Sequence, residues 1–168
     1  MLAIRFAKIS CVAVVGFYVL LVAFGNVTDY GTNYAYLSHG LDMDVVPPES
    51  HIHWRAITTP WLHHVSYLAI IAIEILTAAL CLYGAYVMGR GARAPAAVFH
   101  EAKTAAVAGL TFGFLLYEGG FVSVAGEWFG MWQAGAFDPV PNASRIVVTM
   151  LGVLIFVSMR DEDPFSSG

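Results

Sequence analysis

The sequence predicts an all-α, polytopic membrane protein, built as a bundle of four transmembrane helices with both termini in the cytoplasm. Of its 168 residues, 58% are hydrophobic and 12% charged, and the mean hydropathy of +0.69 is far too high for an ordinary soluble domain. The apolar residues form four runs long enough to cross a bilayer. The basic residues gather mainly at one end of these runs, which predicts the orientation.

The four runs cover residues 9–25, 60–88, 104–126 and 144–159. Spans of about 20 residues use roughly half of the chain, so residues 1–168 are expected to form a single membrane domain without a separate catalytic domain. Pro60 suits the first turn of the second span, with Thr59 as its N-cap. We expect Asn142 or Ser144 to cap the fourth span.

The basic residues predict which side of the membrane holds the termini. An even number of spans places both termini on one side. That side then carries six of the eight basic residues: Arg5, Lys8, Arg90, Arg93, Lys103 and Arg160. Only Arg55 and Arg145 lie on the opposite side. By the positive-inside rule, the richer side is the cytoplasmic side of a bacterial inner membrane.

The predicted outer side carries the long loop 26–59 and an aromatic belt. Within the loop, residues 32–39 are expected to form a short interfacial helix that ends at Gly40, before Pro47 and Pro48. Indole rings favour the headgroup layer. The expected interfacial anchors are Trp54, Trp61, Glu127, Trp128 and Trp132.

Two carboxylates inside the spans are the sharpest candidates for a functional site, because charge in the hydrocarbon is costly. Glu74 is predicted near the middle of the second span and Glu118 inside the third. The spacing also places His63, Tyr67 and Thr77 on the same helix face as Glu74. The two glutamates are expected to approach one bundle interior, either as hydrogen-bonded packing groups or as a proton or ion site.

Histidines on the outer side are candidate metal ligands. They are His39, His51, His53, His63 and His64, with Glu127 nearby. Adjacent histidines cannot share one helix face and no thiolate stands nearby, so hydrogen-bonded interfacial histidines are the preferred interpretation. No two histidines on different spans lie at one depth, which leaves only a single-ligand or shared haem site as an alternative. We therefore predict lipids but no cofactor, with a metal or haem at His63 or His64 as an alternative.

The third span carries small residues at four-residue spacing, Ala105, Gly109 and Gly113. Such a ridge allows another helix to approach closely, either from this chain or from a partner. Cys11 and Cys81 both fall inside apolar segments, so we interpret them as packing residues rather than as a disulfide.

Three stretches carry a resemblance to a known family. They are Asn26-Val-Thr-Asp-Tyr-Gly, then Trp54-Arg55-Ala-Ile-Thr-x-Pro60 followed by His63, His64 and Glu74, and finally Gly126-Glu127-Trp128-Phe129-x-Met131-Trp132-Gln133. Together they resemble the bacterial family of predicted small integral membrane proteins, a four-span family of unknown function. The resemblance implies a bacterial inner-membrane protein and transfers no activity. The chain departs from the family pattern after Gln133, where Ala-Gly-Ala-Phe-Asp-Pro replaces the usual Ser-Trp-Asn-Gly-Gln.

The sequence contains no P-loop, nucleophile elbow, HExxH motif or dinucleotide fingerprint, and its net charge of −4 argues against nucleic-acid binding. The leading hypothesis is a non-enzymatic accessory or scaffold subunit that packs with other membrane subunits and lipids. Its complex would be a larger inner-membrane assembly of respiratory, photosynthetic or monooxygenase type, or an oligomer. The alternatives are a small transporter or proton- or ion-conducting protein that uses Glu74 and Glu118, and a metal or haem protein.

Overall fold

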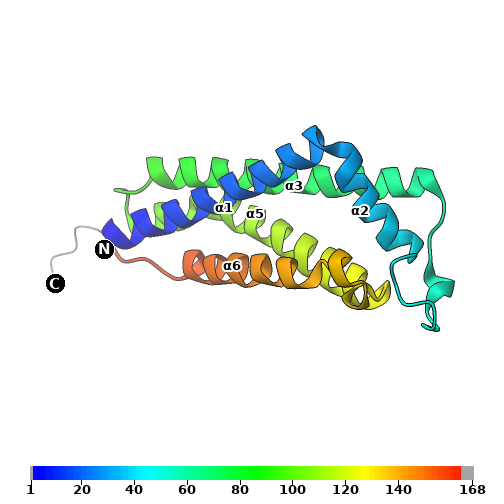
Figure 1. Ribbon diagram of the computed structural model, residues 1–168. Helices are drawn as coiled ribbons and strands as arrows, with labels where there is room; N and C mark the ends of the chain where they lie inside the picture. Colours follow the sequence, from blue (N-terminus) through cyan, green and yellow to red (C-terminus); the bar gives the residue numbers. More distant parts are fainter. Residues whose placement is uncertain (1, 164–168) are drawn as a thin grey trace.

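The computed structural model describes residues 2–163 as an elongated helical bundle (Figure 1). Its elements are α1 (Leu2–Thr28), α2 (Tyr30–Asp42), η1 (His53–Arg55), α3 (Pro60–Arg90), α4 (Ala96–Glu101), α5 (Thr104–Phe114), η2 (Leu115–Trp128), η3 (Met131–Gln133), η4 (Gly135–Phe137) and α6 (Val140–Ser158). Of these, η2 is a π-helix that continues α5, whereas η1, η3 and η4 are short 3-10 turns.

Four segments are long and apolar enough to span a membrane, which confirms the predicted number of spans within the described residues. They are Leu2–Thr28, Pro60–Arg90, Ala96–Trp128 and Gly135–Ser158. The start of α1 and the end of α6 lie together at one end of the bundle, which we call the tail end (Figure 1). The connection between α2 and α3 lies at the opposite end, which we call the loop end (Figure 1). The cytoplasmic placement of the tail end stays a prediction.

The first and last spans begin earlier than their apolar runs. α1 starts at Leu2 rather than at residue 9, because its basic residues are buried by partners instead of facing water. α6 starts at Val140, whose backbone N–H donates a 2.9 Å hydrogen bond to Oδ1 of Asp138. The prediction that Asn142 or Ser144 caps this helix is therefore wrong.

The helix in the loop is longer than expected. α2 covers 13 residues and ends at Asp42, where Met43 adopts a left-handed conformation with φ of 56°. Gly40 does not end the helix but lies within it. Gly40 packs closely against Met131, since a Cβ at this position would lie 2.6 Å from Sδ of Met131. Pro47 and Pro48 lie beyond the end of α2. The predicted start of α3 is right, with Thr59 before Pro60, although the Thr59 side chain makes no capping hydrogen bond.

Small residues bring α3, α5 and α6 close together. A Cβ on Gly109 would lie 2.8 Å from the backbone nitrogen of Cys81, and one on Gly113 would lie 2.7 Å from Sδ of Met150. The predicted packing role of these two glycines is thus fulfilled inside the chain, whereas Ala105 is half-buried. Both cysteines are free, and only Cys81 is fully buried.

A buried cluster of cations fastens the tail end. Lys8 donates hydrogen bonds to the Met159 carbonyl (2.7 Å) and to both oxygens of Asp161 (3.0 and 3.1 Å). Lys103 also binds the Met159 carbonyl, at 2.9 Å, and forms a second ion pair with Asp161. Both lysines thus provide donors for the carbonyl of Met159, the residue directly after α6, which has no helical partner. We call Lys8, Lys103 and Asp161 the tail clamp.

Arg5 extends this fastening to the connection between α3 and α4. Its guanidinium donates to the carbonyls of Ala92 (3.1 Å), Ala94 (2.5 Å) and Glu162 (2.9 Å) and lies over the ring of Phe99. The first helix therefore holds both the connection between α3 and α4 and the chain that follows α6.

We expect replacement of Asp161 by Asn to lower the free energy of unfolding by about 2 kcal/mol or more, because two buried lysines lose their counter-charge. Burial alone would raise the pKa of the Asp161 carboxyl, but the hydrogen bonds and charges of Lys103 and Lys8 hold that pKa below its ordinary value. The stabilisation is therefore complete above the ordinary pKa of aspartate and is lost as pH falls through the lowered value.

Thermal unfolding in detergent from neutral pH to below about pH 4 measures this loss. Asp161→Asn is expected to flatten the acid-induced fall in Tm, whereas Glu101→Gln, at an exposed carboxylate near the same end, leaves it unchanged. An identical acid response in Asp161→Asn and the unaltered protein would contradict this account.

Candidate functional site

The predicted polar face of α3 faces the bundle. His63, Tyr67, Glu74 and Thr77 are all buried there, as the helical spacing predicts. They do not form one cluster, because His63 contacts the loop before α3 and Thr77 lies deeper in the bundle. Within residues 2–163 the Thr77 hydroxyl has no hydrogen-bond partner. The polar site is therefore centred on Glu74.

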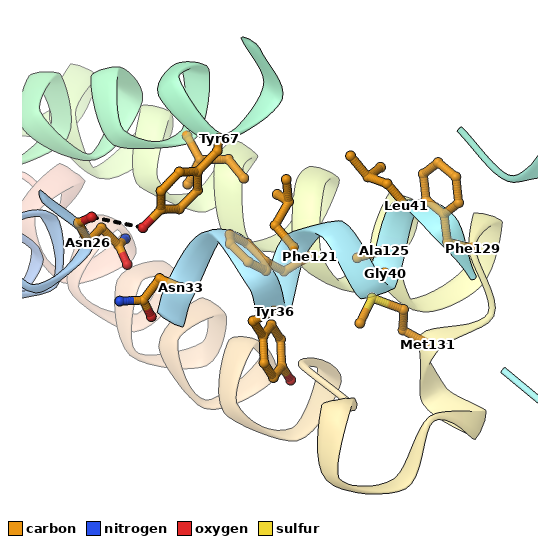
Figure 2. Close-up of a pocket in the computed structure, with 12 residues that line it drawn as sticks. Asn26, Asn33, Tyr36, Gly40, Leu41, Tyr67, Phe121, Ala125, Phe129 and Met131 are labelled. Carbon is orange, nitrogen blue, oxygen red and sulfur yellow. Dashed lines mark hydrogen bonds between the residues drawn. The ribbon is translucent and has the colours of Figure 1, made fainter. Parts of the chain in front are cut away.

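Glu74 is held by a residue from the end of α1. The Asn26 side-chain amide donates a 2.8 Å hydrogen bond to Oε2 of Glu74, which is only 1% exposed. Tyr67 donates in turn to the Asn26 backbone carbonyl at 2.9 Å (Figure 2). The Tyr117 hydroxyl also interacts with the Glu74 carboxyl. It is buried and meets the geometric criteria for a hydrogen bond with no group among the described residues.

We expect Glu74 to lie toward the loop-end boundary of the membrane rather than at its centre. It stands near the middle of α3, as predicted, but α3 has 31 residues and so extends about 46 Å, more than a bilayer core requires. Its partner Asn26 lies roughly 27 Å along α1 from Lys8. A hydrocarbon layer of about 30 Å that starts at the tail clamp therefore ends close to Glu74.

Glu74 borders a cavity of about 420 Å³. We call this space the Glu74 cavity, and α1, α2, α3, η2 and α6 all contribute to its wall. Its polar lining residues are Tyr18, Asn26, Asn33, Tyr36, Glu74, Tyr117, Asp138 and Asn142. A smaller cavity of about 140 Å³ adjoins it through Asn26, Asn33, Tyr36 and Phe121 and reaches Gly40 and Met131 (Figure 2).

The Glu74 cavity is acidic. Of the described residues, Glu74 and Asp138 line it, and no lysine or arginine does. Glu74 forms no ion pair within residues 2–163, whereas Asp138 binds the first N–H of α6. Burial raises the pKa of the Tyr36 phenol and the charge of Asp138 raises it further, so Tyr36 remains a neutral hydrogen-bond donor. Because an unpaired buried carboxylate is costly, this space favours a proton or a cation.

The π-helix η2 shapes one wall of this cavity. Its 14 residues have a wider turn than an α-helix, and Tyr117 and Phe121 stack with ring centres 5.5 Å apart. Both rings border the Glu74 cavity. π-Helical turns occur often at functional sites. Sequence reasoning missed this element, and the adjacent glycines Gly119 and Gly120 are the only local signal for an irregular helix here.

Glu118 does not join Glu74. It follows Tyr117 on η2, so it points to a different side of the helix and lines neither of the two cavities next to Glu74. Its side chain is half-buried and has no hydrogen bond or ion pair within residues 2–163. The side chains next to Glu74 are therefore Asn26 and Tyr117, not Glu118 as predicted.

The loop-end histidines are dispersed among separate partners. His63 binds the Ile57 carbonyl at 2.5 Å, and His64 binds the Tyr30 hydroxyl at 2.9 Å. His39 binds Asp44 and His53 binds the Pro47 carbonyl, whereas His51 is exposed. Among residues 2–163, no three His, Cys, Asp or Glu side chains gather in a way that could hold a metal ion.

The predicted anchor residues all lie exposed at or near the loop end. They are Trp54, Trp61, Glu127, Trp128 and Trp132. Arg55 joins two of them, since its guanidinium lies 4.5 Å from the ring centre of Trp128 and 5.3 Å from that of Trp54. It also donates a 2.9 Å hydrogen bond to the Trp128 carbonyl. This contact fastens the loop before α3 to the end of η2.

Four apolar spans around a buried carboxylate define a small, multi-pass helical membrane protein. The chain belongs to the family described as predicted small integral membrane protein (DUF2165), which matches residues 4–160. This match confirms the resemblance found in the sequence and covers nearly the whole chain. No curated protein and no solved structure matches the chain.

We expect Asn26→Ala to destabilise the protein by about 1–3 kcal/mol, because the buried Glu74 carboxyl loses its hydrogen-bond donor. Asn33→Ala is the matched control, since Asn33 lines the same cavity but its amide donates only to the Asp29 carbonyl at the start of α2. Thermal unfolding in detergent measures both variants. Equal Tm values for the two variants would show that the hydrogen bond from Asn26 to Glu74 contributes no more to stability than the hydrogen bond of Asn33 does.

Proposed function

We propose that this protein is a non-enzymatic membrane binding protein that takes a cationic group into the Glu74 cavity. The observation that carries the proposal is the acidic lining of the cavity, in which a buried carboxyl has an amide partner but, within residues 2–163, no cationic one. A bound ammonium group or metal cation supplies the missing charge and hydrogen-bond donors. The ligand-binding group is Glu74, and Glu118 takes no part.

Hydrogen-bonding groups around the cavity support binding of a polar headgroup. Asn33 and Asn142 present amides, and Tyr36 presents a phenol held in its neutral form. These groups line the cavity and are not paired with Glu74. They can therefore hydrogen-bond to a second polar group of a bound ligand and orient it. Among the described residues that line the cavity, no pair resembles a nucleophile with its base, which supports binding over catalysis.

The packing toward the tail end supports binding from the loop end rather than continuous conduction. Beyond Glu74, Cys81, Met88 and Phe99 are fully buried in the core. Gly84 packs directly on the backbone of Ala106, and the tail clamp lies beyond it. A transporter built on this site requires a second conformation in which these contacts separate.

The test uses ethylammonium and sodium ions with the purified protein in detergent at neutral pH. Each cation that binds is expected to raise Tm with concentration, and a hundredfold excess over Kd stabilises the folded protein by about 2.7 kcal/mol. Glu74→Gln is expected to abolish the rise, because the amide keeps the shape of the carboxyl but cannot carry charge.

Glu118→Gln is the matched control, since Glu118 is also a glutamate within a span but lies outside the cavity. It is expected to retain the full rise in Tm. The proposal fails if neither cation raises Tm, or if both variants respond like the unaltered protein.

A second function, that of an accessory subunit in a larger bacterial inner-membrane complex, is favoured by one apolar groove. We propose that a transmembrane helix of another subunit lies in this groove, which has a volume of about 540 Å³. Its lining includes Leu37, Ile70, Leu116, Val124 and Trp128, drawn from α2, α3 and η2. Helices pack in membranes through such close van der Waals contacts.

Val124→Trp tests this second function by filling the groove. Tagged protein extracted gently from native membranes is expected to bring down a partner, and the variant to recover at least several-fold less of it. Val148→Trp is the control, because Val148 is an exposed valine of α6 outside the groove. Recovery of no partner, or equal recovery with both variants, rejects the accessory role for this face.

A further inference from the structure

A second cleft separates α1 and α6 beside the Glu74 cavity. Its volume is about 660 Å³, and Val14 and Val15 of α1 and Met150 of α6 form its apolar part. Val14, Arg145 and Thr149 along it are exposed, so the cleft lies at the surface of two membrane-spanning helices. Lipid is the molecule that reaches such a surface. We call it the α1/α6 cleft.

The two spaces adjoin. Tyr18, Asn142 and Ile146 line both the α1/α6 cleft and the Glu74 cavity. Asn142 lies one helical turn before Arg145, which it contacts through its side-chain oxygen. A molecule lying between α1 and α6 therefore reaches the acidic cavity past Tyr18 and Asn142 without crossing the packed core.

The chemistry along this route changes in a fixed order. The cleft begins with aliphatic side chains, then presents the guanidinium of Arg145, and opens into a cavity that contains Glu74 and Asp138. Arg145 has five N–H donors, and Asn142 is its one hydrogen-bond partner among the described residues. The remaining donors can bind a phosphate. The order is apolar, then cationic, then anionic.

We propose that an aminophospholipid of the phosphatidylethanolamine type occupies this route. Its acyl chain lies in the α1/α6 cleft, its phosphate binds Arg145, and its ammonium group enters the Glu74 cavity. This inference rests on the proposed binding of a cationic group by Glu74. The order of the lipid's own parts, chain, phosphate and ammonium, matches the order of the protein's surfaces.

Other occupants match this order less well. An anionic headgroup such as glycerol phosphate satisfies Arg145 but brings no positive charge to the Glu74 cavity. A choline headgroup has the right charges, yet its quaternary nitrogen offers no N–H to the carboxyl. An inorganic cation uses the cavity but leaves Arg145 and the apolar walls without a partner. The ethanolamine headgroup is the one that uses all three regions.

The test measures binding of phosphatidylethanolamine, phosphatidylcholine and phosphatidylglycerol with identical acyl chains to the full-length protein in detergent, by native mass spectrometry and by the rise in Tm. On the unaltered protein, phosphatidylethanolamine is expected to bind about tenfold more tightly than either other lipid, as expected for an added charge-assisted hydrogen bond. Equal or tighter binding of phosphatidylcholine or phosphatidylglycerol overturns the inference, whether or not any variant folds.

Two variants assign the contacts. Arg145→Gln is expected to weaken phosphatidylethanolamine about tenfold through the phosphate, and Glu74→Gln to remove its advantage over phosphatidylcholine. Arg93→Gln is the control, since Arg93 is an exposed arginine near the tail end and far along the chain from the cleft. The inference is overturned if Arg145→Gln binds like Arg93→Gln, or if the ethanolamine preference survives Glu74→Gln.

Ethylammonium separates this inference from the proposed function. Because it has no phosphate, its binding is expected to depend on Glu74 and to be unchanged in Arg145→Gln. Ethylammonium binding that needs Glu74, with no preference among lipids, overturns the lipid inference alone. Absence of both ethylammonium binding and the lipid preference overturns both.

Discussion

The carboxyl group of Glu74 imposes the constraint on which the loop end depends. A carboxyl inside an apolar bundle needs a hydrogen-bond partner, and Asn26 provides it from another helix at 2.8 Å. This bond fixes the register of α1 against α3, and Tyr67 fixes Asn26 in turn. α1 ends two residues later, at Thr28, and α2 turns away across the end of the bundle (Figure 1). The cavities beside Glu74 lie where these helices diverge.

The two ends of the bundle therefore differ in construction. At the tail end, buried lysines neutralise Asp161 and bind the carbonyl of Met159 just after α6, and glycines let the helices touch. At the loop end, polar side chains line open space and aromatic side chains face outward. Rigid packing at one end and a hollow at the other is an arrangement suited to holding a ligand. The proposed lipid and cation sites both use the hollow end.

Sequence reasoning predicted the fold well because hydrophobic run length and helical periodicity are local properties. It located four spans, placed His63, Tyr67, Glu74 and Thr77 on one buried face, and identified Gly109 and Gly113 as packing residues. It missed what depends on contacts distant in sequence. Asn26 and Glu74 are 48 residues apart, and Lys8 and Asp161 are 153 apart. Sequence reasoning used Lys8 only to predict orientation, because no residue near it in the chain indicates that Asp161 is its partner.

The tail clamp also bears on how the protein is made. Lys8 belongs to α1 and Asp161 follows α6, so the ribosome makes Lys8 long before Asp161. Throughout synthesis of the intervening helices, the ammonium group of Lys8 lacks the carboxylate that later buries it, so water or lipid headgroups must solvate it in the meantime. The tail clamp can therefore form only after α6 has been made. A chain that stops before Asp161 leaves Lys8 and Lys103 without their shared counter-charge, which distinguishes an incomplete bundle chemically from the finished one.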